Sequence, residues 1–134
     1  MRSSYSTNIK ERKDHSIAIV DKKGRLVVQA ELTLPIHIAS MGGLMKCVLE
    51  KFGDDIHEGD IFVANDPHTA GGTHLPDINY AMPIFIDGEI VAFVCNSAHH
   101  ADIPAMRPGS MAGGLSVIYP VGRRVALIPI APFP

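Results

Sequence analysis

Residues 78–94 read INYAMPIFIDGEIVAFV, two apolar runs joined by an Asp-Gly dipeptide at 87–88. An Asp-Gly pair between two such runs is the strongest short-range signal of a β-hairpin. Upstream, residues 16–21 (SIAIVD) and 25–31 (RLVVQAE) surround the turn sequence KKG and predict a second hairpin. The chain is therefore predicted to consist mostly of β-hairpins.

A helix is predicted over residues 38–52, where apolar side chains recur at the spacing of three and four residues typical of an amphipathic helix. The apolar positions are Ile38, Met41, Leu44, Met45, Val48, Leu49 and Phe52. Gly42 and Gly43 weaken this helix by roughly 1 kcal/mol each relative to alanine. Short strands are also expected at residues 61–64 and 115–119. The predicted fold class is α+β, with hairpins, one helix and long structured loops that form part of a larger fold.

The composition is that of a globular domain, with 134 residues of which 46% are hydrophobic and 19% charged. A net charge of −2 offers no argument for binding nucleic acid or anionic membranes. No run of 18 apolar residues predicts a membrane span, and the polar N-terminus does not look like a secretory signal. Cys47 and Cys95 lie in apolar stretches and are expected to be buried, reduced thiols. We therefore expect a cytoplasmic protein.

Two polar segments on either side of the 78–94 hairpin carry most of the chemistry. Residues 65–77 (NDPHTAGGTHLPD) contain Asp66 at a strand end, where its carboxylate can point into a cleft. In the same segment, His74 and Asp77 are three residues apart, so that an imidazole nitrogen and a carboxylate oxygen can converge on one cation. Segments this long without periodicity are usually functional.

The second polar segment, residues 96–102, reads NSAHHAD. Because side chains alternate along a strand, His99 and His100 cannot both face one point. One is expected to be a ligand and the other a neighbouring or substrate-contacting group. Asp102 is expected either to ligate or to hold a histidine ring in its tautomer.

A set of histidines and carboxylates without thiolates suits Zn, Mn or Fe(II) and disfavours Cu(I). A bound cation of this kind activates water or polarises a carbonyl. The alternative is that these are ordinary hydrogen-bonded histidines, as expected for His37 and His57, each of which has a small chance of ligand contact. No regular zinc signature and no phosphate-binding G-x-x-x-x-G-K-[ST] loop is present, so any ATP chemistry must come from a partner.

Three stretches resemble the hydantoinase B/5-oxoprolinase family, which includes N-methylhydantoinase B subunits and subunits of acetone and acetophenone carboxylases. They are residues 3–21 (SSYSTNIKERKDHSIAIVD), 62–78 (FVANDPHTAGGTHLPDI) and 96–111 (NSAHHADIPAMRPGSM). The resemblance implies a cytosolic B-type subunit that acts with a hydantoinase A-like, ATP-dependent subunit in an oligomer. It implies hydrolysis of a cyclic amide, 5-oxoproline or a hydantoin, at a zinc or manganese centre.

The resemblance also implies roles for individual residues. His74, Asp77 and His99 are the metal ligands expected first, and Asp66 is expected as a further ligand. His100 and Asp102 are expected to be catalytic, although a ligand or supporting role is also open to them.

The resemblance covers residues 1–119, and residues 120–134 are expected to be a divergent tail without a stable element. Because family subunits are several hundred residues long, a truncated or frame-shifted reading frame is one hypothesis. Two other functions stay open at this point. One is a subunit of a ketone carboxylase, and the other is a non-catalytic remnant.

Overall fold

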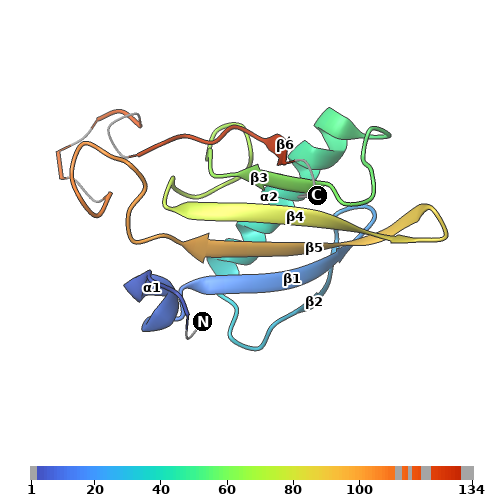
Figure 1. Cartoon of the computed structure of the whole chain (residues 1–134), viewed down its shortest axis with the longest axis horizontal. Helices are drawn as coiled ribbons and strands as arrows, with labels where there is room; N and C mark the ends of the chain where they lie inside the picture. The colour runs from blue at the N-terminus through green and yellow to red at the C-terminus, as the bar shows by residue number, and fades with distance from the viewer. Residues whose placement is uncertain (1–2, 111–112, 115, 119–121, 131–134) are drawn as a thin grey trace.

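The fold is an antiparallel β-sheet packed on one side against a helix (Figure 1). The computed structural model describes residues 3–110, 113–114, 116–118 and 122–130. In these residues the sheet has six strands in the order β2-β1-β5-β4-β3-β6, which confirms the α+β class. The elements are α1 (Thr7–Lys10), β1 (His15–Asp21), β2 (Leu26–Gln29), α2 (Pro35–Phe52), β3 (Ile61–Ala64), β4 (Asp77–Ile86), β5 (Glu89–His99) and β6 (Ile128–Ile130).

Both predicted hairpins form. At the β4–β5 turn, Asp87 and Gly88 have φ angles of 52° and 80°, the left-handed pair that a two-residue hairpin turn requires. The strand after this turn is longer than the predicted 89–94 because β5 continues to His99. The extra length pairs His99 with Asp77, the first residue of β4. Two residues expected in polar loops are thus cross-strand neighbours.

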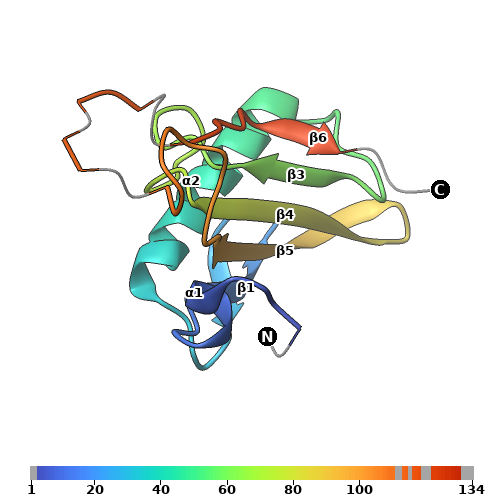
Figure 2. The same ribbon diagram turned by 60° about the vertical axis from the view of Figure 1, so that its left-hand side comes forward.

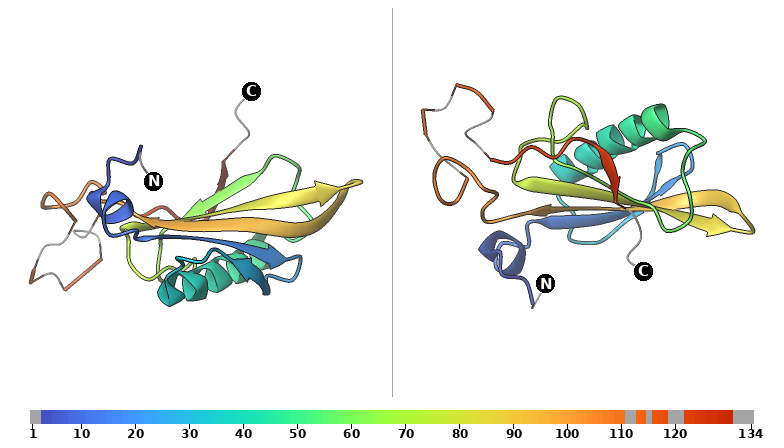
Figure 3. Two further views of the ribbon diagram at one scale, coloured as in Figure 1. Left: turned by 90° about the horizontal axis from the view of Figure 1, so that it is seen from below. Right: turned by 45° about the horizontal axis from the view of Figure 1, so that its top comes forward.

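Helix α2 begins at Pro35, three residues before the predicted start. Proline suits the first turn of a helix because the amide hydrogen it lacks would have no partner there. The helix lies across one face of the sheet (Figure 3). Its buried residues Met41, Leu44, Met45 and Val48 pack on inward-facing strand residues that include Phe93.

Gly43 of α2 touches the polar loop that precedes β4. A Cβ atom at Gly43 would lie 2.6 Å from the Cα of Gly71. Such a separation is shorter than atomic contacts allow, so only glycine permits this approach of the two backbones. The contact holds the loop against the helix, close to the end of the sheet where β4 begins.

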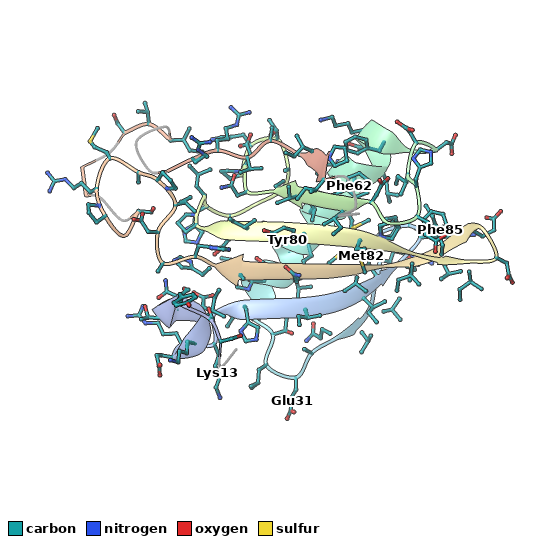
Figure 4. All side chains as sticks on the ribbon, viewed as in Figure 1. Lys13, Glu31, Phe62, Tyr80, Met82 and Phe85 are labelled. Carbon is teal, nitrogen blue, oxygen red and sulfur yellow. The ribbon has the colours of Figure 1, made fainter. Side chains whose placement is uncertain are left out.

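Within the described part of the chain, the other face of the sheet carries only the short helix α1, at the end where β5 ends (Figure 3). Tyr80 and Met82 of β4 lie on this face, and the side chain of Met82 is exposed (Figure 4). No helix among the described residues is long and apolar enough to cross a membrane.

The segment after Tyr119 differs from the prediction of no stable element. Ile128–Ile130 form β6, which pairs with β3 at the edge of the sheet (Figure 2). Pro129 suggested an irregular tail, but proline is tolerated on an edge strand because no further strand needs its missing N–H group. The predicted strand at 115–119 is not observed in residues 116–118, and Leu115 and Tyr119 lie outside the described residues.

Candidate metal centre

Three of the predicted ligands meet at the end of the sheet where β5 ends and β1 and β4 begin, on the left in Figure 1. Asp77 and His99 come from paired strand ends, and His74 comes from the loop just before β4. Asp77 is almost fully buried, whereas the side chain of His74 is 42% exposed. The cluster is therefore supported by the sheet and open to solvent through His74.

One oxygen of Asp77 is shared by both histidines. The Oδ1 atom lies 3.1 Å from His74 Nε2 and 3.0 Å from His99 Nδ1. The ligand atoms that the three residues offer all lie within 4.8 Å of one another. Ligand atoms in a tetrahedral zinc site with bonds of about 2.1 Å are about 3.4 Å apart. The donor set and its spacing therefore fit a small divalent cation after a modest adjustment.

Asp14 joins this cluster, although the sequence did not single it out. Its Oδ2 atom lies 3.7 Å from His99 Nδ1, and its backbone carbonyl accepts a hydrogen bond from the His99 N–H group. The start of one strand lies beside the end of its antiparallel neighbour, so β1 brings Asp14 next to the end of β5. The signal available in the sequence was an aspartate two residues before the first predicted strand.

His37, to which the sequence assigned a small chance of ligand contact, also reaches the site. It is buried in the first turn of α2, and its Nε2 atom lies 3.4 Å from Asp14 Oδ1 and 3.7 Å from Asp77 Oδ2. Its Nδ1 atom is 2.8 Å from the hydroxyl oxygen of Ser16. Helix α2 thus supplies a second layer of polar contact behind the cluster.

The charges of His74 and Asp77 support each other. Burial acts to raise the pKa of Asp77, but hydrogen bonds from His74 and Thr73 outweigh it and lower that pKa below its ordinary value. The hydrogen bond to Asp77 raises the pKa of His74, against the opposing effect of its burial. Without a cation, the pair therefore favours a charged histidine beside a charged carboxylate.

Asp66 lies outside the three-residue cluster. Its fully buried carboxylate pairs with Arg124, whose Nε atom is 2.5 Å from Oδ2, and it also accepts hydrogen bonds from the Thr69 hydroxyl and the His68 N–H group. Burial acts to raise the pKa of Asp66, but these hydrogen bonds lower it overall. The structure therefore shows Asp66 organising the polar loop and joining it to the C-terminal segment.

The two residues predicted to be catalytic flank the cluster without entering it. The backbone N–H group of His100 donates to the Pro76 carbonyl, and burial lowers the pKa of its imidazole. The exposed Asp102 accepts a hydrogen bond from the Ser110 hydroxyl at 2.8 Å. Within the described residues, neither side chain is part of the His74, Asp77 and His99 group.

An open pocket of about 420 Å³ gives access to the cluster. It is lined by Asp14, Leu34, Ile36, His37, Thr73, His74, Asp77 and His99. The exposed side chains of Leu34 and Ile36 are the apolar part of this lining. A small molecule with one carbonyl group and an aliphatic body would match both parts of this lining.

The chain is similar in sequence and fold to several known enzymes. The chain is 46% identical over 111 residues to a 5-oxoprolinase of Dictyostelium discoideum, a match covering 83% of this chain and 9% of that protein. The ATP-dependent caprolactamase of Pseudomonas jessenii has the same fold with a TM-score of 0.80 and 33% identity, over 89% of this chain and 20% of that one. An acetone carboxylase structure matches with a TM-score of 0.88 and 25% identity, over 98% of this chain and 17% of that one.

The chain thus spans only about a tenth to a fifth of the length of these proteins. A family model described as "Hydantoinase B/oxoprolinase" matches residues 1–131. This match includes the segment after Tyr119 that the sequence was expected to leave outside the family. The chain belongs to the hydantoinase B/oxoprolinase family.

Proposed function

We propose that this chain provides the divalent-metal centre of an ATP-dependent enzyme that hydrolyses a cyclic amide, by ring opening of 5-oxoproline or a hydantoin. The observation that carries the proposal is the convergence of His74 Nε2 and His99 Nδ1 on one oxygen of the buried Asp77. Family membership and the 46% identity to a 5-oxoprolinase support the choice of reaction.

The proposed ligands are His74, Asp77 and His99, with Asp14 as a fourth. Oxygen and imidazole donors suit zinc or manganese. A cation bound here would polarise the carbonyl group of the amide substrate, or would hold a water molecule that loses a proton near neutral pH. The pocket would hold the ring against Leu34 and Ile36, so that its carbonyl group faces the polar side of the lining. His100, next to the cluster in sequence, remains our candidate for proton transfer.

ATP is proposed to act through a hydantoinase A-like partner subunit in a cytoplasmic oligomer. The caprolactamase and the acetone carboxylase to which this chain is similar are both described as ATP-dependent. Because the match covers a fifth or less of those chains, the remaining parts of the active enzyme would come from other sequence.

A second candidate function is the carboxylation of a ketone. The TM-score of 0.88 to acetone carboxylase, over 98% of this chain, favours it. Reconstitution with the A-like partner separates the two reactions. ATP hydrolysis stimulated by 5-oxoproline or hydantoin supports the hydrolase, whereas stimulation by acetone only in the presence of bicarbonate supports the carboxylase.

The metal centre is tested by elemental analysis of the full chain purified without chelator, followed by titration with Zn²⁺ and Mn²⁺. We expect about one equivalent of bound metal and its loss in His99→Ala. His57→Ala is the matched control, because His57 is exposed and outside the cluster. A folded wild-type chain that binds neither cation would refute the proposal and favour a non-catalytic remnant.

A further inference from the structure

His37 has a different environment from the three clustered ligands. It lies in the first turn of α2 with 1% of its surface exposed, enclosed between the helix and the sheet. Its ring has a polar partner on each side, Ser16 at Nδ1 and the two carboxylates near Nε2. A buried imidazole with partners at both nitrogens has a defined tautomer.

The hydrogen bonds of Ser16 indicate which tautomer this is. The Ser16 hydroxyl oxygen accepts a hydrogen bond from the Leu34 N–H group at 3.0 Å. The hydroxyl hydrogen is then available for His37 Nδ1, which lies 2.8 Å away. When Nδ1 accepts, the ring hydrogen of a neutral imidazole is on Nε2. An Nε2 atom that carries hydrogen has no free lone pair for a metal, so His37 is not a ligand in this arrangement.

In the carboxylates of Asp14 and Asp77, one oxygen lies near His37 and the other lies near His99. Asp14 Oδ1 and Asp77 Oδ2 lie 3.4 and 3.7 Å from His37 Nε2. Asp14 Oδ2 and Asp77 Oδ1 lie 3.7 and 3.0 Å from Nδ1 of His99, a proposed ligand. One oxygen of each carboxylate therefore faces the proposed cation site, and the other faces His37.

We propose that His37 is a positioning residue, which holds the carboxylates of Asp14 and Asp77 in the orientation that binds the metal. This inference rests on the proposed metal centre. The Nε2–H group lies between two negative charges that repel each other, and it attracts the outer oxygen of each. The Thr73 hydroxyl helps by donating to Asp77 Oδ2 at 2.8 Å. Outer partners of this kind raise metal affinity about 10- to 100-fold.

The test measures Zn²⁺ affinity by competition with a coloured chelator and records the visible spectrum with Co²⁺ bound. His37→Ala is expected to bind Zn²⁺ about 10- to 100-fold more weakly. Its Co²⁺ spectrum is expected to keep the wild-type band positions and intensities, because the ligand set is unchanged. His99→Ala is expected to change that spectrum, because it removes a ligand.

Two further variants separate positioning from a purely structural role. His37→Gln is expected to recover part of the lost affinity, since its amide N–H group can take the place of Nε2–H. Ser16→Ala is expected to cause a smaller loss, because it removes the partner that selects the tautomer. The melting temperature of each metal-free variant shows whether affinity changes independently of stability. If His37→Ala does not fold, the Gln and Ser16 variants carry the test.

Three results would overturn the inference. Unchanged Zn²⁺ affinity in the folded His37 variants would show that the carboxylates need no support. A Co²⁺ spectrum in His37→Gln that indicates fewer ligands would make His37 a ligand. A wild-type chain that binds no metal would remove the proposed function itself, which distinguishes that failure from the first two.

Discussion

The two ends of the β4–β5 hairpin differ in what determines them. At the turn end, Asp87 and Gly88 adopt the left-handed conformations that their residue types favour, so local chemistry is sufficient. At the open end, Asp77 and His99 meet through strand register, and their polar neighbours come from a loop, from the start of β1 and from α2. Local sequence thus determines the turn, whereas the site depends on contacts between distant segments.

The largest expected difference between the two ends is in metal binding. Asp77→Ala removes the oxygen that both histidines face. Zn²⁺ affinity should fall more than about 100-fold, beyond the loss typical of an outer partner. Asp87→Asn, at the exposed turn, is the matched control and should bind Zn²⁺ as the wild type does. Competition titration measures both, and a loss below tenfold in Asp77→Ala would contradict the assignment of this ligand.

The next test concerns the contact between Gly43 of α2 and Gly71 of the loop before β4, because this contact positions the loop that carries His74. Gly43→Ala would place a methyl group 2.6 Å from the Gly71 backbone, and we expect unfolding to require about 1–3 kcal/mol less free energy. Zn²⁺ affinity should fall with it as the His74 loop is displaced. In Gly42→Ala the added Cβ meets nothing within 4 Å, and stability should rise by about 0.5–1 kcal/mol. Urea unfolding measures the unfolding free energy of both variants. The same change in Gly43→Ala and Gly42→Ala would refute the close contact between Gly43 and Gly71.

The pH dependence of stability should change sign when metal binds. His74 has a pKa raised above 6.5, so its contribution to the metal-free chain is complete below pH 6.5 and is lost as pH rises through the folded-state value. Asp77 has a pKa lowered below 3.8, so its contribution is present above pH 3.8 and is lost as pH falls through the folded-state value.

Above pH 6.5 the His74–Asp77 pair should therefore contribute less to the melting temperature of the chelated chain as pH rises. In the Zn²⁺-loaded chain the stabilisation by metal should increase over the same range, because the ligands must lose their protons. The difference between chelated and loaded melting temperatures measures this. His74→Ala is the control, and its melting temperature should depend less on pH in both the chelated and the Zn²⁺-loaded protein. If the melting temperature of the wild type changes equally with pH in the two forms, a metal at His74 is contradicted.

The smallest effect is expected at the turn. Gly88→Ala places a side chain at a φ of 80°, which costs about 1 kcal/mol although the added Cβ meets nothing within 4 Å. Zn²⁺ affinity should stay at the wild-type value, since the turn is at the far end of the hairpin. Chemical unfolding and metal titration of the same sample test this, and a drop in affinity would show that the two ends are coupled.

The elements that could be predicted are those whose signals lie within a few residues. Both hairpins and α2 were identified because turn residues and apolar spacing act locally. The extension of β5 to His99 was missed because NSAHH is polar, and β6 was missed because of its prolines. Pairing with a neighbouring strand outweighed local preference in both cases.

The site divides in the same way. The sequence by itself determined the grouping of histidines and carboxylates around a hairpin at residues 78–94, with His74 and Asp77 before it and His99 after it, because this grouping depends on residue type and short spacing. Only the tertiary structure added Asp14 and placed His37 behind the cluster, and only it directed Asp66 to Arg124, 58 residues further along the chain. The physical reason is that strand order and helix packing bring these groups within a few ångströms, and no local pattern of residues encodes such distances.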